Sequence, residues 1–225
     1  MGMDGVANVK AIIFDMDGVL IDSEPRYLDI FEEFFAQNGR KVSREAMLPT
    51  VGSSNRETWR IFAQLWGDGC DPQWLKEHFY STGPKGMLDF GKVAFPGMVQ
   101  TLRCLKARGL ALYIASASAQ PTIERMMRQT GIESYISGAV SGETVRRSKP
   151  FPDVYLQAIA LSGFSAEECI AVEDSTYGIQ AAKNAQLRVV GVHSDLAPSA
   201  QSEADFKIDT VAQLPELLFG AAEGL

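Results

Sequence analysis

Two aspartates, Asp15 and Asp17, follow directly on the apolar run Val9 to Phe14. Because side chains alternate along an extended segment, both carboxylates point the same way while Met16 faces the other way. Carboxylates so close repel each other unless a hard cation such as Mg²⁺ lies between them or one is protonated. The pair taken alone is typical of a solvated turn. Its position after a buried strand, with Gly18 allowing a sharp turn, favours a functional site.

A hydroxyl group, that of Ser116, ends a second apolar run in the same way. The run covers Leu110 to Ala115, and a helical pattern begins soon afterwards, near Pro121. A strand-end hydroxyl beside free backbone N–H groups can hold a phosphate. The alternative interpretation is a helix N-cap, which is the commoner role of an isolated serine.

A lysine and a second acidic pair complete the set. Lys149 lies in a loop before a helix opened by Pro152, where a lone lysine is usually solvated. Glu173 and Asp174 follow the apolar run Cys169 to Val172. Because the carboxyl ends of parallel strands meet at one edge of a sheet, we expect all these groups to converge on one crevice.

Four short apolar runs predict buried strands of a parallel sheet, because a half-exposed strand would alternate apolar and polar residues. They are Val9 to Phe14, Leu110 to Ala115, Cys169 to Val172 and Leu187 to Val192. Helical patterns lie between them, several with proline at the start or glycine just past the end. These cover Met98 to Ala107, Pro121 to Thr130, Pro152 to Leu161 and Ser175 to Ala185. The alternation predicts an α/β fold, a Rossmann-like parallel sheet with helices on both faces.

Residues 25–90 break this alternation, because they contain helical patterns with no strand between them. The patterns cover Pro25 to Asn38, Ser43 to Leu48, Asn55 to Trp66 and Pro72 to Tyr80. We therefore expect a helical-bundle cap domain of residues 23–91, inserted into an α/β core domain of residues 1–22 and 92–225. Aromatic residues in these helices recur at spacings of three and four, which is typical of a bundle core.

The composition restricts the class of partner. The chain has 225 residues, a formal net charge of −7 and a sequence pI near 4.9, so nucleic acid and anionic membranes are disfavoured. A local cation can still attract a small phosphorylated substrate. Three widely spaced cysteines suggest neither a disulfide framework nor a zinc cluster. We expect a cytoplasmic protein, either a monomer or a small homo-oligomer.

The combined motifs resemble a known family. The segment Phe14 to Leu20, Ser116, Lys149 with its following proline, and the segment Glu173 to Ser175 resemble the four motifs of the haloacid dehalogenase superfamily, in order and spacing. Further likeness lies in Asp22 to Pro25, Phe95 to Gly97 and Asp174 to Ala182. Nearly the whole chain thus resembles the subgroup with a helical cap after the first motif, which includes β-phosphoglucomutases and sugar-phosphate phosphatases.

The resemblance implies a role for each motif residue. Asp15 would attack phosphorus and form an aspartyl-phosphate, while Asp17 would protonate the leaving oxygen and then activate water. Ser116 and the amide of Ala117 would hold the phosphoryl oxygens. Lys149 would neutralise those oxygens and the nucleophile.

The resemblance also implies a bound Mg²⁺ ion. Its ligands would be Asp15, the backbone carbonyl of Asp17, and Asp174, with Glu173 adjacent and bound through water. Such an ion offsets the charge that would otherwise keep a carboxylate away from a phosphate.

The predicted cap supplies candidates for substrate binding. The segment Gly52 to Glu57 resembles the substrate-specificity loop of the subgroup, so Gly52 and Arg56 are expected at the substrate. A solvated Arg56 on the first turn of a helix is an equal alternative. Tyr27 is expected to line the mouth of the crevice.

Tyr27 also bears on the reaction, because β-phosphoglucomutases carry a histidine at the matching place. We therefore predict a phosphatase of small phosphorylated metabolites, such as sugar phosphates. A hexose-phosphate mutase of the β-phosphoglucomutase type is the first alternative. A non-catalytic binding module is less favoured, because the catalytic set is complete.

Overall fold

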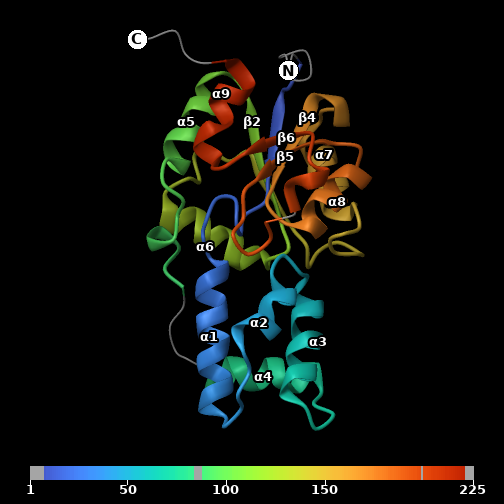
Figure 1. The fold of residues 1–225 in the computed structure, drawn as a ribbon. Coiled ribbons are helices and arrows are strands. Elements are labelled where there is room, and N and C mark those ends of the chain that lie inside the picture. Colours follow the sequence, from blue (N-terminus) through green and yellow to red (C-terminus); the bar gives the residue numbers. More distant parts are fainter. Residues whose placement is uncertain (1–7, 84–87, 199, 221–225) are drawn as a thin grey trace.

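The computed structural model describes residues 8–83, 88–198 and 200–220, and its centre is a parallel sheet (Figure 1). Within these residues six strands form one sheet in the order β3-β2-β1-β4-β5-β6. The strands are β1 (Ala11–Phe14), β2 (Ala111–Ser116), β3 (Gly138–Ser141), β4 (Cys169–Glu173), β5 (Arg188–Val192) and β6 (Phe206–Ile208). All neighbouring pairs are parallel, so the predicted fold class is confirmed.

The central strand β1 sets the position of the functional residues. Phe14, its last residue, pairs with Ile114 of β2 on one side and with Val172 of β4 on the other. Because the chain order reverses about β1, a crevice opens beyond the carboxyl ends of these three strands. The residues that follow Phe14 and Val172 therefore emerge side by side.

Helices cover both faces of the sheet. Alternate residues of β1 belong to different cores, Ile12 and Phe14 to one and Ala11 and Ile13 to the other. The first core is closed by α5 (Met98–Ala107), α6 (Gln120–Thr130) and α9 (Leu214–Phe219). The second is closed by α7 (Asp153–Ser162) and α8 (Thr176–Asn184). Figure 1 shows α5 and α9 on one side of the sheet and α7 and α8 on the other.

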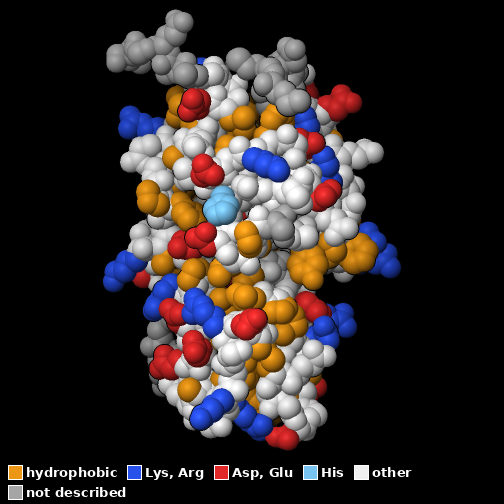
Figure 2. All heavy atoms as spheres, viewed as in Figure 1, with side chains coloured by type: hydrophobic (Ala, Val, Ile, Leu, Met, Phe, Trp, Pro, Cys, Tyr) orange, Lys and Arg blue, Asp and Glu red, His pale blue; other side chains and the backbone are white. Residues whose placement is uncertain are grey.

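The helices between β1 and α5 form a separate bundle at the crevice end of the sheet (Figure 1). They are α1 (Glu24–Gln37), α2 (Arg44–Met47), α3 (Asn55–Trp66) and α4 (Pro72–Thr82). The bundle has its own core, built mainly of aromatic side chains: Leu28, Phe34, Phe35, Met47, Trp59, Phe62, Ala63, Trp66 and Leu75. Figure 2 shows further hydrophobic side chains gathered where the bundle meets the rest of the molecule.

Short 3₁₀ turns fill several connections, namely η2 (Leu48–Thr50), η3 (Phe90–Lys92), η4 (Ala166–Glu168), η5 (Ala200–Glu203) and η6 (Val211–Gln213). The helix predicted over Ser43 to Leu48 is in fact α2 followed by η2, because Pro49 lacks the N–H that would continue an α-helix. Strands β3 and β6 were not predicted from the sequence. Over the described residues, no helix has the length and apolar character needed to cross a bilayer.

Candidate active site

A buried lysine joins two carboxylates at the centre of the crevice. Asp15 follows β1 and is 7% exposed, and Lys149 is 6% exposed. The Nζ of Lys149 lies 2.9 Å from Oδ1 of Asp15 and 2.6 Å from Oε1 of Glu173. Burial alone would lower the pKa of Lys149, but the two carboxylates together raise it above its ordinary value. The solvated interpretation of Lys149 is therefore wrong, and the residue is a fixed positive charge.

Two serines hold the second aspartate. The hydroxyl of Ser23 donates to Oδ1 of Asp17, and that of Ser118 donates to Oδ2 over 3.2 Å. Burial raises the pKa of Asp17, and the two serine hydrogen bonds oppose this shift. Asp17 is thus oriented, and its environment favours the protonated form that a general acid requires. Neither serine was among the sequence candidates, although Ser118 follows Ser116 by two residues and Ser23 lies in a quoted motif.

The Ser116 side chain supports the loop after β2 and does not line the crevice cavity. It is fully buried, and its Oγ accepts a hydrogen bond of 3.0 Å from the backbone N–H of Ser118. Ala117, Ser118 and Ala119 line the cavity instead. The hydroxyl therefore shapes the loop that presents these residues.

Three buried carboxylates could together hold a metal ion. Asp15, Glu173 and Asp174 each place an oxygen within 4.8 Å of the others. Burial first, and then the charge of Glu173, raises the pKa of Asp15 from 3.8 to about 7 against the opposing effect of Lys149. Burial and the neighbouring carboxylates also raise the pKa of Asp174 well above its ordinary value. One lysine does not balance these charges, so the cluster suits a cation or bound protons.

The oxygens of Glu173 are already engaged by protein donors. Oε1 accepts from Lys149 and from the hydroxyl of Tyr155, each at 2.6 Å. Oε2 accepts from the backbone N–H of Asp174 at 3.2 Å and from the hydroxyl of Ser175 at 3.3 Å. Glu173 is thus the most firmly held member of the cluster. Tyr155 was not foreseen, because a single tyrosine inside a helix has no distinguishing pattern.

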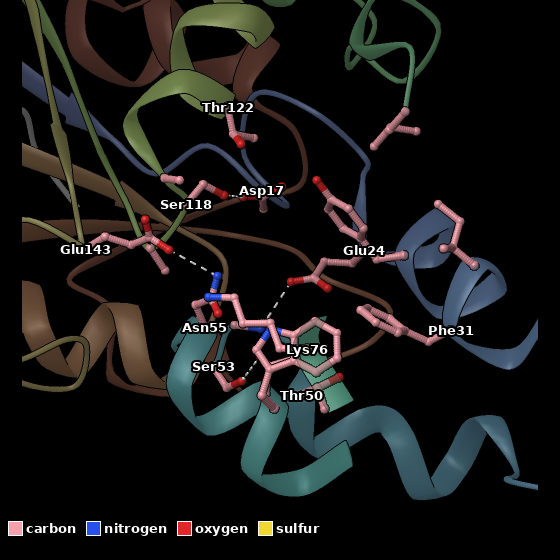
Figure 3. Close-up of a pocket in the computed structure, with 18 of the residues that line it drawn as sticks. Asp17, Glu24, Phe31, Thr50, Ser53, Asn55, Lys76, Ser118, Thr122 and Glu143 are labelled. Carbon is pink, nitrogen blue, oxygen red and sulfur yellow. Dashed lines mark hydrogen bonds between the residues drawn. The ribbon is translucent and has the colours of Figure 1, made fainter. Parts of the chain in front are cut away.

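A cavity of about 940 Å³ lies between the strand ends and the helical bundle. Asp15, Asp17 and Lys149 line it from the core side, as Figure 3 shows for Asp17. The bundle side includes, among polar and aliphatic residues, the aromatic residues Tyr27, Phe31, Trp59, Phe79 and Tyr80. Tyr27 therefore lies where the sequence placed it.

Contacts between bundle and core run along the loop before α3. A Cβ on Gly52 would come within 2.6 Å of that of Ser175, so this loop lies against the core. Within the bundle, the backbone N–H of Gly52 donates to Oε1 of Glu24 over 3.1 Å. Asn55 donates to Glu143 over 3.2 Å (Figure 3). Burial, and next the charge of Asp17, raises the pKa of Glu24 to about 8.

Arg56 does not reach the cavity. It is exposed on the first turn of α3, whereas Asn55, Thr58 and Trp59 line the cavity. Successive helical residues point about 100° apart, so the face that presents Asn55 and Trp59 turns Arg56 outward. Of the two interpretations of Arg56 left open by the sequence, the structure agrees with the solvated one. Gly52 lines the cavity, and its contact with substrate stays a prediction.

The acidic crevice lies at the switch point of a parallel sheet and is faced by an inserted helical bundle, which is where α/β folds of this kind bind their ligands. A family model described as haloacid dehalogenase-like hydrolase matches residues 12–192. The chain belongs to this family, and the predicted membership is confirmed.

Similar proteins agree with this assignment. Hexitol phosphatase B of Escherichia coli (strain K12) is 31% identical over 215 residues, covering 92% of this chain and 94% of that protein. The Arabidopsis thaliana protein SUPPRESSOR OF QUENCHING 1, chloroplastic, is 28% identical over 204 residues, which cover 89% of this chain. The matched region is only 19% of that longer protein. The crystal structure of CbbY from Rhodobacter sphaeroides in complex with phosphate has a TM-score of 0.74 at 25% identity, covering 92% of this chain and 96% of that one.

Proposed function

We propose that the protein is a phosphatase of small phosphorylated metabolites, with sugar phosphates as its substrates and Asp15 as its nucleophile. The observation that carries the proposal is the ion pair of 2.9 Å between Asp15 and Lys149 at the wall of a cavity that Asp17 also lines. The names of the similar proteins, a hexitol phosphatase and a phosphate-bound CbbY, support this reaction. The helices of residues 23–91 would act as a cap over the core.

The reaction divides into two displacements. A carboxylate oxygen of Asp15 attacks phosphorus, the bond from phosphorus to the substrate oxygen breaks, and Asp17 gives that oxygen a proton. In the second step Asp17 takes a proton from water, whose oxygen attacks the same phosphorus. Inorganic phosphate leaves and the Asp15 carboxylate is restored. The hydroxyls of Ser23 and Ser118 keep Asp17 oriented through both steps.

Positive charge and backbone donors would stabilise the phosphoryl group. Lys149 supplies a fixed cation, because its two carboxylate partners hold it in place. The backbone N–H of Ala117 would bind a phosphoryl oxygen, since Ala117 lines the cavity. Ser116 would contribute through the loop, by holding the N–H of Ser118.

Mg²⁺ fits the carboxylate cluster. Asp15 and Asp174 would be direct ligands, with the backbone carbonyl of Asp17, while Glu173 would act through water because its oxygens already have protein donors. Burial, and then the charge of Glu173, raises the pKa of Asp15 and of Asp174, and a bound divalent cation would offset both effects. When bound, the ion would offset the repulsion between the carboxylate and the phosphate.

Asp15→Asn tests the nucleophile. The substitution removes the attacking oxygen anion but keeps the shape of the side chain, so phosphate release should fall at least ~10³-fold while the fold persists. Phosphate release from a panel of sugar phosphates measures the effect, and circular dichroism checks folding. The control is Asp209→Asn, at an exposed carboxylate outside the cavity. Unchanged activity of Asp15→Asn on the best substrate would show that the nucleophile is another group.

The same panel separates hydrolysis from mutase activity. Tyr27 lines the cavity, and it stands where a mutase of this type would carry histidine. Phosphate release should therefore exceed interconversion of β-glucose 1-phosphate and glucose 6-phosphate. Efficient interconversion with little released phosphate would support the mutase instead.

A further inference from the structure

An arginine that forms no ion pair with any described residue lies in the wall of the cavity. Arg125 belongs to α6 and lines the cavity together with Asp15 and Asp17. Its Nε and Nη1 atoms are buried and have no hydrogen-bond partner among the described residues. Its guanidinium lies 4.7 Å from the centre of the Phe90 ring, and no carboxylate of the described chain forms an ion pair with it.

Such an arginine is expensive to keep in a folded protein. Arginine stays protonated, so it cannot escape burial by losing its charge. Stacking on the Phe90 ring stabilises the cation, but it gives the buried Nε and Nη1 no hydrogen-bond acceptor. A partner that arrives through the cavity would account for the residue.

A second unpaired cation faces the same space from the bundle. Lys76 of α4 lines the cavity and forms no ion pair among the described residues (Figure 3). It lies one helical turn from Tyr80, which also lines the cavity, so both belong to one face of α4. The third cation of the lining, Lys149, forms ion pairs with Asp15 and Glu173. Among the described residues, Arg125 and Lys76 thus form no ion pair with the carboxylates at the nucleophile.

We propose that Arg125, assisted by Lys76, binds a second anionic group on the part of the substrate that is not transferred. This inference rests on the proposed phosphatase function and narrows its substrate class to compounds with two anionic groups. The second group would be a phosphate or a carboxylate, because both match the planar fork of a guanidinium. Tyr27 and Tyr80 would line the space beside it.

Three probe substrates test the inference: fructose 1-phosphate, fructose 1,6-bisphosphate and phosphoglycolate. The wild-type protein should have a higher kcat/KM for at least one of the last two than for fructose 1-phosphate. In Arg125→Met, the KM for that substrate should rise about 10- to 100-fold, since a charge-assisted hydrogen bond contributes about 1.5–3 kcal/mol. The change for fructose 1-phosphate should be several-fold smaller. The bisphosphate and the phosphoglycolate distinguish phosphate from carboxylate as the second group.

The matched control is Arg128→Met, at an exposed arginine one turn further along α6 and outside the cavity lining. It should leave all three KM values unchanged. Urea unfolding of both variants checks that the loss in Arg125→Met is not loss of the fold. Equal loss on all three substrates, or a wild-type preference for fructose 1-phosphate over both others, would overturn the inference.

A binding measurement tests the anion site independently of the proposed phosphatase reaction, because it uses a variant without the nucleophile. Calorimetric titration of Asp15→Asn with fructose 1,6-bisphosphate, phosphoglycolate and fructose 1-phosphate should show tighter binding of a doubly anionic ligand. Adding Arg125→Met should remove that preference. If the preference is found but no substrate is hydrolysed by the wild type, the anion site stands and the phosphatase proposal fails. If the wild type hydrolyses a substrate but no doubly anionic ligand binds more tightly, the phosphatase proposal stands and the anion site is refuted.

Discussion

At the scale of single residues, Lys149 differs from the other lysines of the described chain in its surroundings. Its side chain is 3% exposed and contacts both Asp15 and Glu173, which are also buried. Lys183 forms an ion pair of the same length, 2.6 Å, with Asp205, but its side chain is 41% exposed. The Lys149–Glu173 and Lys183–Asp205 pairs have equal lengths but different burial, so comparing them tests how burial alone changes the contribution of an ion pair to stability.

Replacing each lysine by methionine should give unequal losses of stability. Lys149→Met leaves two buried carboxylates without their cation and should lower the free energy of unfolding by about 3–5 kcal/mol. Lys183→Met removes an exposed pair and should lower it by about 1 kcal/mol or less. Urea denaturation at pH 8 measures both values. Similar losses in the two variants would contradict the structural importance given to burial.

At the scale of elements, the turn after β1 brings the two acidic strand ends together. Gly18 has a φ of +79°, and a Cβ there would lie 2.0 Å from Oδ2 of Asp174. The turn thus passes directly over the carboxylate that follows β4. Gly39, after α1, has a similar φ of +71° but has open space around it.

The two glycines provide a matched test of this close approach. Gly39→Ala should cost about 1–2 kcal/mol of stability, because only the left-handed backbone is strained. Gly18→Ala should add about 1–3 kcal/mol for the clash, and it should also reduce phosphate release, because Asp174 must move. Thermal unfolding and activity assays of both variants measure this. Equal stability and full activity of Gly18→Ala would show that the turn has room for a side chain.

At the scale of the whole molecule, the sheet and the bundle enclose a cavity in which buried carboxylates outnumber paired cations. Burial, and then the charge of Glu173, raises the pKa of Asp15 in the folded protein from 3.8 to about 7. Between these values the unfolded chain has lost a proton that the folded protein retains. Stability should therefore fall as the pH rises through this interval, and a cation that replaces the proton should restore it.

Mg²⁺ should accordingly raise the unfolding temperature, and by more at pH 8 than at pH 5.5, where protons compete for the same oxygens. Saturation to 100 times the dissociation constant would stabilise the fold by about 2.7 kcal/mol. Scanning calorimetry with Mg²⁺ and with EDTA measures the shift. Asp174→Asn should reduce it strongly, whereas Asp209→Asn should not. A shift that is absent, or equal at both pH values, would argue against Mg²⁺ at this cluster.

The sequence by itself determined the α/β class and the residues gathered at the sheet edge. Continuous apolar runs identified β1, β2, β4 and β5, because strands buried on both faces cannot alternate. Since parallel strands end at one edge, the position of Asp15 and Asp174 after such runs was enough to predict that they meet. The strands β3 and β6 escaped prediction because they are short and mix small or polar residues with apolar ones.

Only the tertiary structure decided which helix residues face the cavity. Arg56 and Asn55 are neighbours in the sequence, yet only Asn55 lines the cavity. Arg125 and Lys76 come from different parts of the chain, and nothing in their local sequence distinguishes them from solvated side chains. The physical reason is that a helix residue's direction depends on how the whole helix packs. That packing is set by long-range contacts of the hydrophobic cores, which no local pattern encodes.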